Sequence, residues 1–196
     1  MQEKNVIGIM FVDTVTEFSQ VRQDLVSRPA YAQAMDKDID FIAISSLGRY
    51  KKLSPEEWAV VEREHNSDRT KVTYAAELKG CFKYALVLAA KKQLENRILA
   101  NHPVSVLAAN IAMNLQCLYD AGVATGNGTE EERAQYRSLV DRFAGEDIIN
   151  QKRQLELSSN GRYIFTTNNT HNVQMTGPKV VMDGIKWVLD HLAVQL

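Results

Sequence analysis

Two apolar stretches near the start of the sequence decide the fold: VIGIMFV at Val6–Val12 and IDFIAI at Ile39–Ile44. Apolar runs of this length that do not alternate with polar residues are typical of strands buried on both faces, as the strands of a parallel sheet are. The segment between the two runs is long enough for one helix. The sequence therefore predicts two parallel strands joined by a crossover helix, which is a β-α-β unit.

The middle of the sequence is expected to be largely helical. SPEE at 54–57 and TEEE at 129–132 each carry the residues of a capping box, in which a hydroxyl and a glutamate close the first turn of a helix. Apolar residues at helical spacing predict further helices over 73–99 and 104–118. The stretch 84–88, YALVL, could equally form a strand by itself.

The C-terminal part has a different pattern. LEL at 155–157 and YIF at 163–165 flank Asn160-Gly161, a dipeptide that strongly favours a β-hairpin turn. A last helix is expected to begin at Pro178. The whole pattern predicts an α/β or α+β fold with a small sheet started by the β-α-β unit, large helical content, and a C-terminal β-hairpin plus helix.

Length and composition limit the classes of protein. The 196 residues predict a single globular domain over 1–196, in which 151–196 is a candidate hairpin-plus-helix subunit. The 23 basic and 24 acidic residues are spread along the chain, so no basic surface for nucleic acid is expected. No apolar run is long enough to predict a membrane span. Cys81 and Cys117 lie in apolar stretches and are expected to be free thiols, which favours a cytoplasmic location.

Cofactor and metal motifs are absent from the sequence. No Gly-x-Gly-x-x-Gly follows the first predicted strand, so no dinucleotide cofactor is expected. The four histidines are scattered and none has a second ligand at a spacing typical of metal sites, so no metal is expected either. Among them His171 is the best candidate for a functional imidazole, because it lies in a polar loop.

Polar residues directly after the two predicted strands are the candidates for a site, because ligands bind at the carboxyl ends of parallel strands. Asp13 and Ser45 are the candidate catalytic residues. The basic turn at 49–52, RYKK, could hold an anion nearby. The candidate ligand-binding residues are Thr14, Ser46, Arg49, Lys51 and Lys52.

A carboxylate after one strand and a hydroxyl after the next resembles the first two motifs of haloacid-dehalogenase-like phosphohydrolases. The resemblance implies that Asp13 attacks phosphorus and that Ser45 binds the transferred phosphoryl group. That family has a second aspartate two residues after the nucleophile, where this sequence has Val15. The general acid that the family uses therefore has no counterpart here.

Three functions remain open at the level of sequence, and whether the chain is an enzyme stays undecided. The first is a non-catalytic adaptor or regulatory protein that acts through protein surfaces, since no complete catalytic set can be assembled from motifs. The second is a small-molecule phosphate-ester hydrolase or ligand-binding domain that uses Asp13 and Ser45. The third is a subunit of a larger assembly. Val180 and Trp187 lie beside the main apolar stripe of the last helix and predict an interface with a protein partner or with a second copy in a homo-oligomer.

Overall fold

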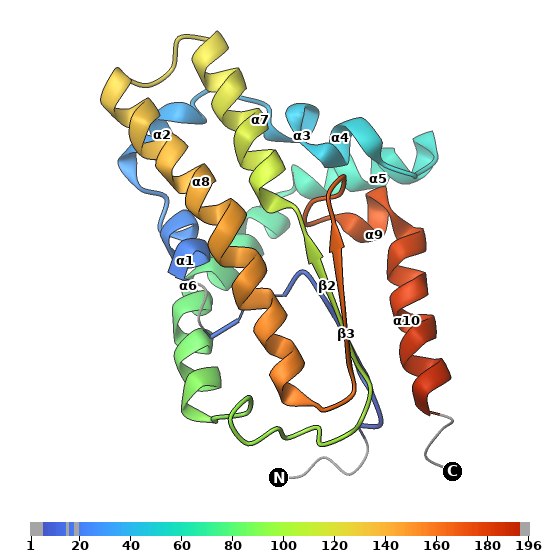
Figure 1. Cartoon of the computed structure of the whole chain (residues 1–196). Coiled ribbons are helices and arrows are strands. Elements are labelled where there is room, and N and C mark those ends of the chain that lie inside the picture. Colours follow the sequence, from blue (N-terminus) through green and yellow to red (C-terminus); the bar gives the residue numbers. More distant parts are fainter. Residues whose placement is uncertain (1–5, 15, 18–19, 193–196) are drawn as a thin grey trace.

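The computed structural model describes residues 6–14, 16–17 and 20–192, without the side chains at 20, 21, 78, 79, 81 and 82. Its centre is a parallel sheet of three strands in the order β1-β2-β3 (Figure 1). All residues of the middle strand are buried. The strands are β1 (Ile9–Val12), β2 (Val104–Ala109) and β3 (Gly161–Thr166). Because they run parallel, their carboxyl ends meet at one edge of the sheet.

Helices form most of the remaining structure. Six of them lie between β1 and β2 in the described part of the chain. These are α1 (Gln20–Val26), α2 (Ala30–Met35), α3 (Phe41–Ile44), α4 (Ser46–Tyr50), α5 (Pro55–His65) and α6 (Asp68–Ala90). The later ones are α7 (Ile111–Ala124), α8 (Glu130–Lys152), the 3-10 helix η1 (Arg153–Leu157), α9 (Val173–Thr176) and α10 (Pro178–Leu192). The mixed α/β class and the large helical content predicted from the sequence are confirmed.

Both predicted capping boxes are present. The Ser54 hydroxyl accepts a hydrogen bond from the Glu57 N–H at 3.2 Å, and the Glu57 carboxylate accepts one from the Ser54 N–H at 2.7 Å. Thr129 and Glu132 make the same two hydrogen bonds at the start of α8. These reciprocal bonds satisfy N–H groups that a helix cannot pair internally, which is why α5 and α8 begin where they do.

Helices cover both faces of the sheet. On one face α10 packs against β1 and β2, and Gly184 allows it to approach Met10 and Ser105 closely. On the other face Phe11 and Val106 belong to an apolar cluster, and α8 packs against β2 (Figure 1). This arrangement explains why every residue of β1 is apolar and why β2 is apolar except at Ser105, as in strands covered on two sides.

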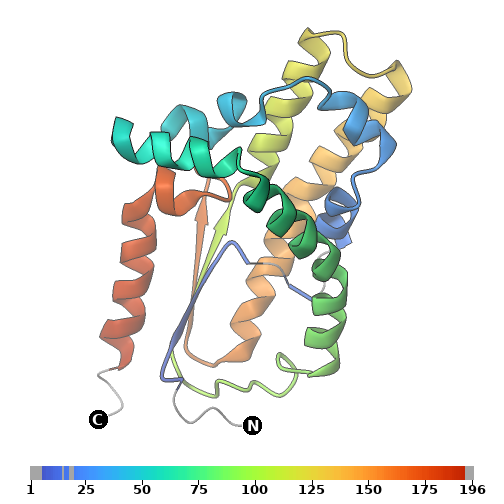
Figure 2. The same ribbon diagram turned by 180° about the vertical axis from the view of Figure 1, so that it is seen from behind.

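A second apolar core joins α2, α7 and α8 beyond the carboxyl ends of the strands. Met35 and Tyr136 are fully buried in it, and Tyr136 stacks on Tyr119 with 6.2 Å between the ring centroids. Helices α5 and α6 follow one another outside this core, separated by residues 66–67, and lie nearest the viewer in Figure 2. In the described residues no helix has both the length and the apolarity required to cross a lipid bilayer.

The prediction of a second strand at Ile39–Ile44 is wrong. Residues 41–44 form the short helix α3, and the Asp40 carboxylate caps it by accepting a hydrogen bond from the Ala43 N–H at 3.1 Å. Four apolar residues in a row fit a helical turn as well as a strand, so the cap at Asp40 decides the local structure. The neighbour that pairs with β1 is β2, which the helical spacing of residues 104–118 had predicted to be the start of a helix.

The predicted C-terminal hairpin is also wrong. Residues 155–157 belong to η1, and β3 pairs in parallel with β2 instead of folding back on the chain before it. The Asn160 carbonyl accepts a hydrogen bond from the Val104 N–H at 2.9 Å, which places Asn160-Gly161 at the start of this parallel pairing. Long-range pairing with the buried strand β2 thus overrides the local turn preference.

The long helix predicted over 73–99 is present in part. Helix α6 includes residues 84–88, so this stretch is helical, but it ends at Ala90. The following segment is a series of turns in which Lys92, Arg97 and Ala100 have positive φ angles of 50°, 43° and 49°. Such angles are incompatible with a right-handed helix, and the turns bring the chain to the start of β2.

Candidate functional site

Asp13 lies at the point where β1 ends. Its N–H donates to the Leu107 carbonyl at 2.8 Å and so continues the pairing with β2, while its own φ of +47° turns the chain away. Aspartate is one of the few residues other than glycine that adopt this left-handed conformation. The Asp13 side chain is completely buried, so its carboxylate depends on protein partners for all of its hydrogen bonds.

The first partner of Asp13 is His171, which follows β3 in the loop before α9. The Asp13 Oδ2 atom and the His171 Nδ1 atom are 2.7 Å apart, although 158 positions separate the two residues in the sequence. The His171 side chain is 63% exposed. When a neutral imidazole donates its Nδ1 proton to a carboxylate, its Nε2 atom is left as an acceptor. The contact therefore gives a solvent-accessible base that is oriented by a buried acid.

The other carboxylate oxygen of Asp13 is held by three donors. Oδ1 accepts from Arg22 Nη2 at 2.9 Å, from Gln151 Nε2 at 2.7 Å and from the Ala109 N–H at 3.3 Å. Burial would raise the pKa of Asp13, but the hydrogen bond with His171, the Arg22 charge and the Gln151 bond together lower this pKa below 3.8. Asp13 is therefore an ionised, fixed acceptor at neutral pH.

A second carboxylate completes this buried network. Asp147 on α8 accepts from Arg22 Nε at 2.5 Å and from Arg22 Nη2 at 2.9 Å, a bidentate arrangement. Gln151, one turn further along α8, donates to Asp147 Oδ2 at 3.0 Å. Burial would lower the pKa of Arg22, but the hydrogen bond with Asp147 and the charges of both carboxylates raise it, so the guanidinium stays protonated.

The loop that carries His171 is fixed by its preceding residue. Thr170 is fully buried, and its hydroxyl accepts a hydrogen bond from Asn114 Nδ2 at 3.0 Å and bonds with the Ser46 hydroxyl. The Ser46 N–H in turn donates to Asn114 Oδ1 at 3.0 Å. The structure thus brings Ser46, a predicted ligand-binding residue, to the Thr170-His171 dipeptide from helix α4.

The other residues predicted at strand ends have structural partners. The Ser45 hydroxyl donates to the Ile42 carbonyl at 3.0 Å at the junction of α3 and α4, and Ser45 does not follow a strand. The Thr14 hydroxyl donates to Gln154 Oε1 at 2.9 Å. Thr14 is therefore bonded to η1, so it lies next to Asp13 in the sequence but has a different partner.

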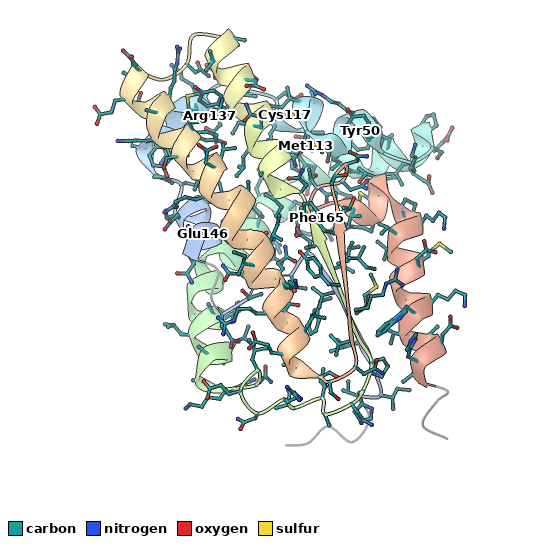
Figure 3. All side chains as sticks on the ribbon, in the orientation of Figure 1. Tyr50, Met113, Cys117, Arg137, Glu146 and Phe165 are labelled. Atoms are coloured by element: carbon teal, nitrogen blue, oxygen red, sulfur yellow. The ribbon has the colours of Figure 1, made fainter. Side chains whose placement is uncertain are left out.

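The basic side chains of residues 49–52 do not converge on one site. Arg49 Nη1 lies 4.0 Å from the Cys117 sulfur, Lys51 Nζ lies 4.0 Å from the centroid of the Trp58 ring, and Lys52 is exposed. Figure 3 labels Cys117 on α7, Tyr50 on α4 and Phe165 near the end of β3. Arg49, Lys51 and Lys52 therefore have separate surroundings, and Asp13 has its own cation in Arg22.

The two residues predicted as an interface lie on α10. Val180 and Trp187 are both half-buried, and the Trp187 ring stacks on the His191 ring with 4.1 Å between centroids. Of the two cysteines, Cys117 is a half-buried free thiol, and the side chain of Cys81 lies outside the described residues.

Sequence reasoning missed three members of the network around Asp13: Arg22, Asp147 and Gln151. The fold brings these residues together from α1 and α8, and no local motif marks such a meeting. One signal could have been used: Asp147 and Gln151 are four positions apart, which places two polar side chains on one face of a helix.

Two hollows of the surface lie away from Asp13 and His171. One follows α6 at Tyr74 and Glu77, and the other lies between α1, α2 and α8 at Tyr31 and Arg142. The His171 side chain is accessible to solvent, since it is 63% exposed. Among the described residues, no group of three or more His, Cys, Asp or Glu side chains is placed to hold a metal ion.

Comparison with known proteins gives two distant relatives. The first, from Hormonema carpetanum, is named "Probable transporter efuK" and is 26% identical over 189 residues, which are 95% of this chain and 26% of the relative. The second, from Gibberella zeae, is named "AB hydrolase superfamily protein" and is 22% identical over 192 residues, which are 95% of this chain and 58% of the relative. No family model and no solved structure matches the chain.

Proposed function

We propose that the chain provides the acid and base of a hydrolase, with His171 as the general base and Asp13 as the residue that orients it. The observation that carries this proposal is the 2.7 Å contact between Asp13 Oδ2 and His171 Nδ1. A buried carboxylate that accepts from Nδ1 fixes the imidazole tautomer and stabilises the imidazolium that forms when Nε2 takes a proton. The exposed His171 ring is accessible to such a proton donor.

The order of the residues along the chain supports the same proposal. In α/β-hydrolases the catalytic residues follow one another as nucleophile, acid and histidine, each at the end of a strand or in the loop after it. Here Asp13 follows β1 and His171 follows β3, in that order. The relative from Gibberella zeae carries the name of this superfamily, and the chain spans 58% of its length.

The attacking group is the remaining component of such a site. Residues 1–12 contain no Ser, Thr or Cys, and the sequence contains no Gly-x-Ser-x-Gly motif. We therefore assign to this chain the acid–base pair alone, which would activate either a water molecule or a hydroxyl group. In both cases the base is His171 Nε2.

This assignment gives Asp13 a different role from the one implied by the resemblance to phosphohydrolases. A nucleophilic carboxylate needs an oxygen that is free to attack phosphorus. In Asp13, Oδ1 accepts three hydrogen bonds and Oδ2 contacts His171. The geometry supports Asp13 as an orienting group, and Ser45 has no part in the proposed mechanism.

Hydrolysis of an activated ester tests the proposal. The assay compares the 196-residue protein with His171→Gln, His171→Ala and Asp13→Asn on p-nitrophenyl acetate. We expect each variant to lose at least about tenfold in kcat/KM, because general-base catalysis contributes roughly 10²-fold or more. His65→Gln removes an exposed imidazole at the end of α5 and serves as the control for unspecific imidazole reactivity.

A wild-type rate that equals the rates of both His171 variants would contradict the proposal.

If the rate does depend on His171, a fluorophosphonate probe identifies the attacking group. Labelling of the protein, lost in Asp13→Asn, indicates an activated side-chain hydroxyl, whereas ester hydrolysis without labelling indicates water.

A second candidate function, the adaptor or assembly subunit expected from the sequence, has one specific observation in its favour. Helix α6 exposes several large apolar side chains, among them Val72 at 70%, Tyr84 at 62% and Leu86 at 73%. Such side chains on a helix with few packing partners are typical of protein interfaces. A solution mass above that of one chain, lowered by Tyr84→Lys with Leu86→Lys, is the expected result for a homo-oligomer. A monomeric wild type would count against it.

The proposed cellular location is the cytoplasm. The free thiol of Cys117 supports it, because reducing compartments keep such thiols unpaired. Localisation of a tagged chain by fluorescence microscopy is the direct test.

A further inference from the structure

Arg22 has an unusual environment for an arginine. Its side chain is only 9% exposed, and its guanidinium lies between two buried carboxylates, those of Asp13 and Asp147. It binds Asp147 through Nε and Nη2 and Asp13 through Nη2. Buried charges are costly unless they are paired, so this arrangement persists because the guanidinium satisfies both acids at once.

The hydrogen bonds divide the Asp13 carboxylate into two halves. All three anchoring donors bind Oδ1, whereas Oδ2 contacts His171. An anchor on one oxygen alone fixes the rotation of the carboxylate plane, and this rotation determines where Oδ2 points. The position of Arg22 therefore influences the exposed His171 ring through one side chain, that of Asp13.

Helix α8 holds Arg22 in this position. Asp147 grips the guanidinium in the planar, two-bond geometry that suits arginine and that lysine cannot reproduce. Gln151, on the same face of α8, donates to both Asp147 Oδ2 and Asp13 Oδ1. The turn at Asp13, with its left-handed backbone, is thus joined to a long regular helix by two side-chain bridges.

We infer that Arg22 and Asp147 form a positioning unit, which holds the Asp13 carboxylate in the orientation that keeps the His171 proton on Nδ1. This inference rests on the proposed function of Asp13 and His171. The described hydrogen bonds and ion pairs of Arg22 and Asp147 do not include His171, so their effect passes through Asp13. Without the guanidinium, Asp13 and Asp147 would repel each other, and the Asp13 side chain would turn to a new partner.

The chain contains a matched control for this unit. Arg142 Nη2 and Asp24 Oδ2 form a second Arg–Asp ion pair between α8 and α1, at 2.5 Å, but both side chains are partly exposed and neither contacts Asp13. If ion pairing between these helices only supports the fold, loss of either pair should have similar consequences. If Arg22 positions the acid, only its loss should change His171.

The experiment compares Arg22→Gln, Arg22→Lys and Asp147→Asn with Arg142→Gln in the full 196-residue protein. Nitrogen-15 NMR of the imidazole at pH 8 gives the tautomer of His171, and hydrolysis of p-nitrophenyl acetate gives kcat and KM. We expect the Nδ1–H tautomer in the wild type and in Arg142→Gln. Arg22→Gln and Asp147→Asn should give a mixture of tautomers and lose about tenfold or more in kcat, with KM changed less than about twofold. Arg22→Lys should restore part of the rate, because it returns the charge without the two-bond geometry.

A folded Arg22→Gln protein with the wild-type tautomer and rate overturns the inference. If Arg22→Gln does not fold, Asp147→Asn decides, because it preserves the side-chain volume and keeps Arg22 while it removes the charge that holds the guanidinium in place. The two proposals fail in different ways. A wild-type rate that does not depend on His171 contradicts the hydrolase, whereas an unchanged tautomer in the folded variants contradicts the positioning unit.

Discussion

The Thr170 hydroxyl accepts a hydrogen bond from Asn114 Nδ2 at 3.0 Å, which ties the residue next to His171 to helix α7. The Ser46 hydroxyl bonds with the same oxygen from α4. All three side chains are buried, so the histidine loop is fixed on one side by this neutral cluster and on the other by the ionised Asp13. An exposed imidazole can thus have a defined position.

Replacing Thr170 by valine keeps the shape of the side chain but removes its hydroxyl. The Asn114 amide and the Ser46 hydroxyl then lose a buried partner, and we expect the free energy of unfolding to fall by about 1–3 kcal/mol. Urea unfolding of the wild type and the variant measures this loss. The double variant with Ser46→Ala should lose less than the sum of the two single changes, and full additivity would show that the hydroxyls are not coupled.

Asp13 should make the stability depend on pH in the acid range. Its folded-state pKa is lowered below 3.8, so its contribution to stability is fully present above that ordinary value and is lost as the pH falls through the lower folded value. Asp13→Asn lacks this contribution. Urea unfolding from about pH 7 down to about pH 3 should show the stability difference between wild type and variant shrinking below about pH 4. A difference that stays constant would mean that the carboxylate gains nothing from its partners.

We expect alanine substitutions at two helical glycines to change the stability of the protein in opposite directions. A Cβ atom on Gly122 would lie 2.6 Å from the Met35 carbonyl oxygen, so Gly122→Ala should force α7 and α2 apart and cost about 1–3 kcal/mol. Gly145 in α8 has no neighbour within 4 Å of such an atom, so Gly145→Ala should stabilise the helix by about 0.5–1 kcal/mol. Thermal melting of both variants checks the signs, and equal melting temperatures would contradict the packing of α7 on α2.

The predicted interface on α10 is tested at Trp187. Because Met182 and Leu189 on the same helix are 67% and 58% exposed, we expect Trp187→Glu to lower the solution mass of a self-associating chain. If the ring packs only within its own chain, the mass stays constant and the melting temperature falls instead, by an amount equivalent to about 1–2 kcal/mol. Lys179→Gln, an exposed change on the same helix, serves as the control. If neither the solution mass nor the melting temperature changes, Trp187 contributes neither to an interface between chains nor to packing within its own chain.

Part of this fold follows directly from local sequence. The strand predicted at Val6–Val12 is present over Ile9–Val12, because a continuous apolar run indicates a strand covered on both faces. The helix starts at Ser54 and Thr129 are also present, because their capping residues act within one turn. Asp13 was found as a strand-end carboxylate, and His171 as a polar loop histidine. Each of these features depends on neighbours in the sequence.

The features that sequence reasoning missed depend on distant partners. The apolar residues from Val104 match a helical spacing, and only pairing with β1 and β3 on both sides shows that they form a central strand. Asn160-Gly161 favours a tight turn, but β2 captures the following residues in parallel. The contact between Asp13 and His171, and the support from Arg22, need the completed sheet and α8 in place. No pattern within a short window contains that information.

The pairing of β1 with β2 has a consequence for how the chain folds. Ile9 and Val104 are separated in the sequence by all of α1 to α6, whereas only α7, α8 and η1 separate β2 from β3. Closing the longer loop costs more chain entropy, and contacts between distant residues slow the approach to the native state. We expect β2, α7, α8 and β3 to assemble first and β1 to add last, so that Asp13 meets His171 in the final step. Hydrogen exchange during refolding should then protect the amides of β2 before that of Asp13, and the candidate site would form only in molecules whose folding is complete.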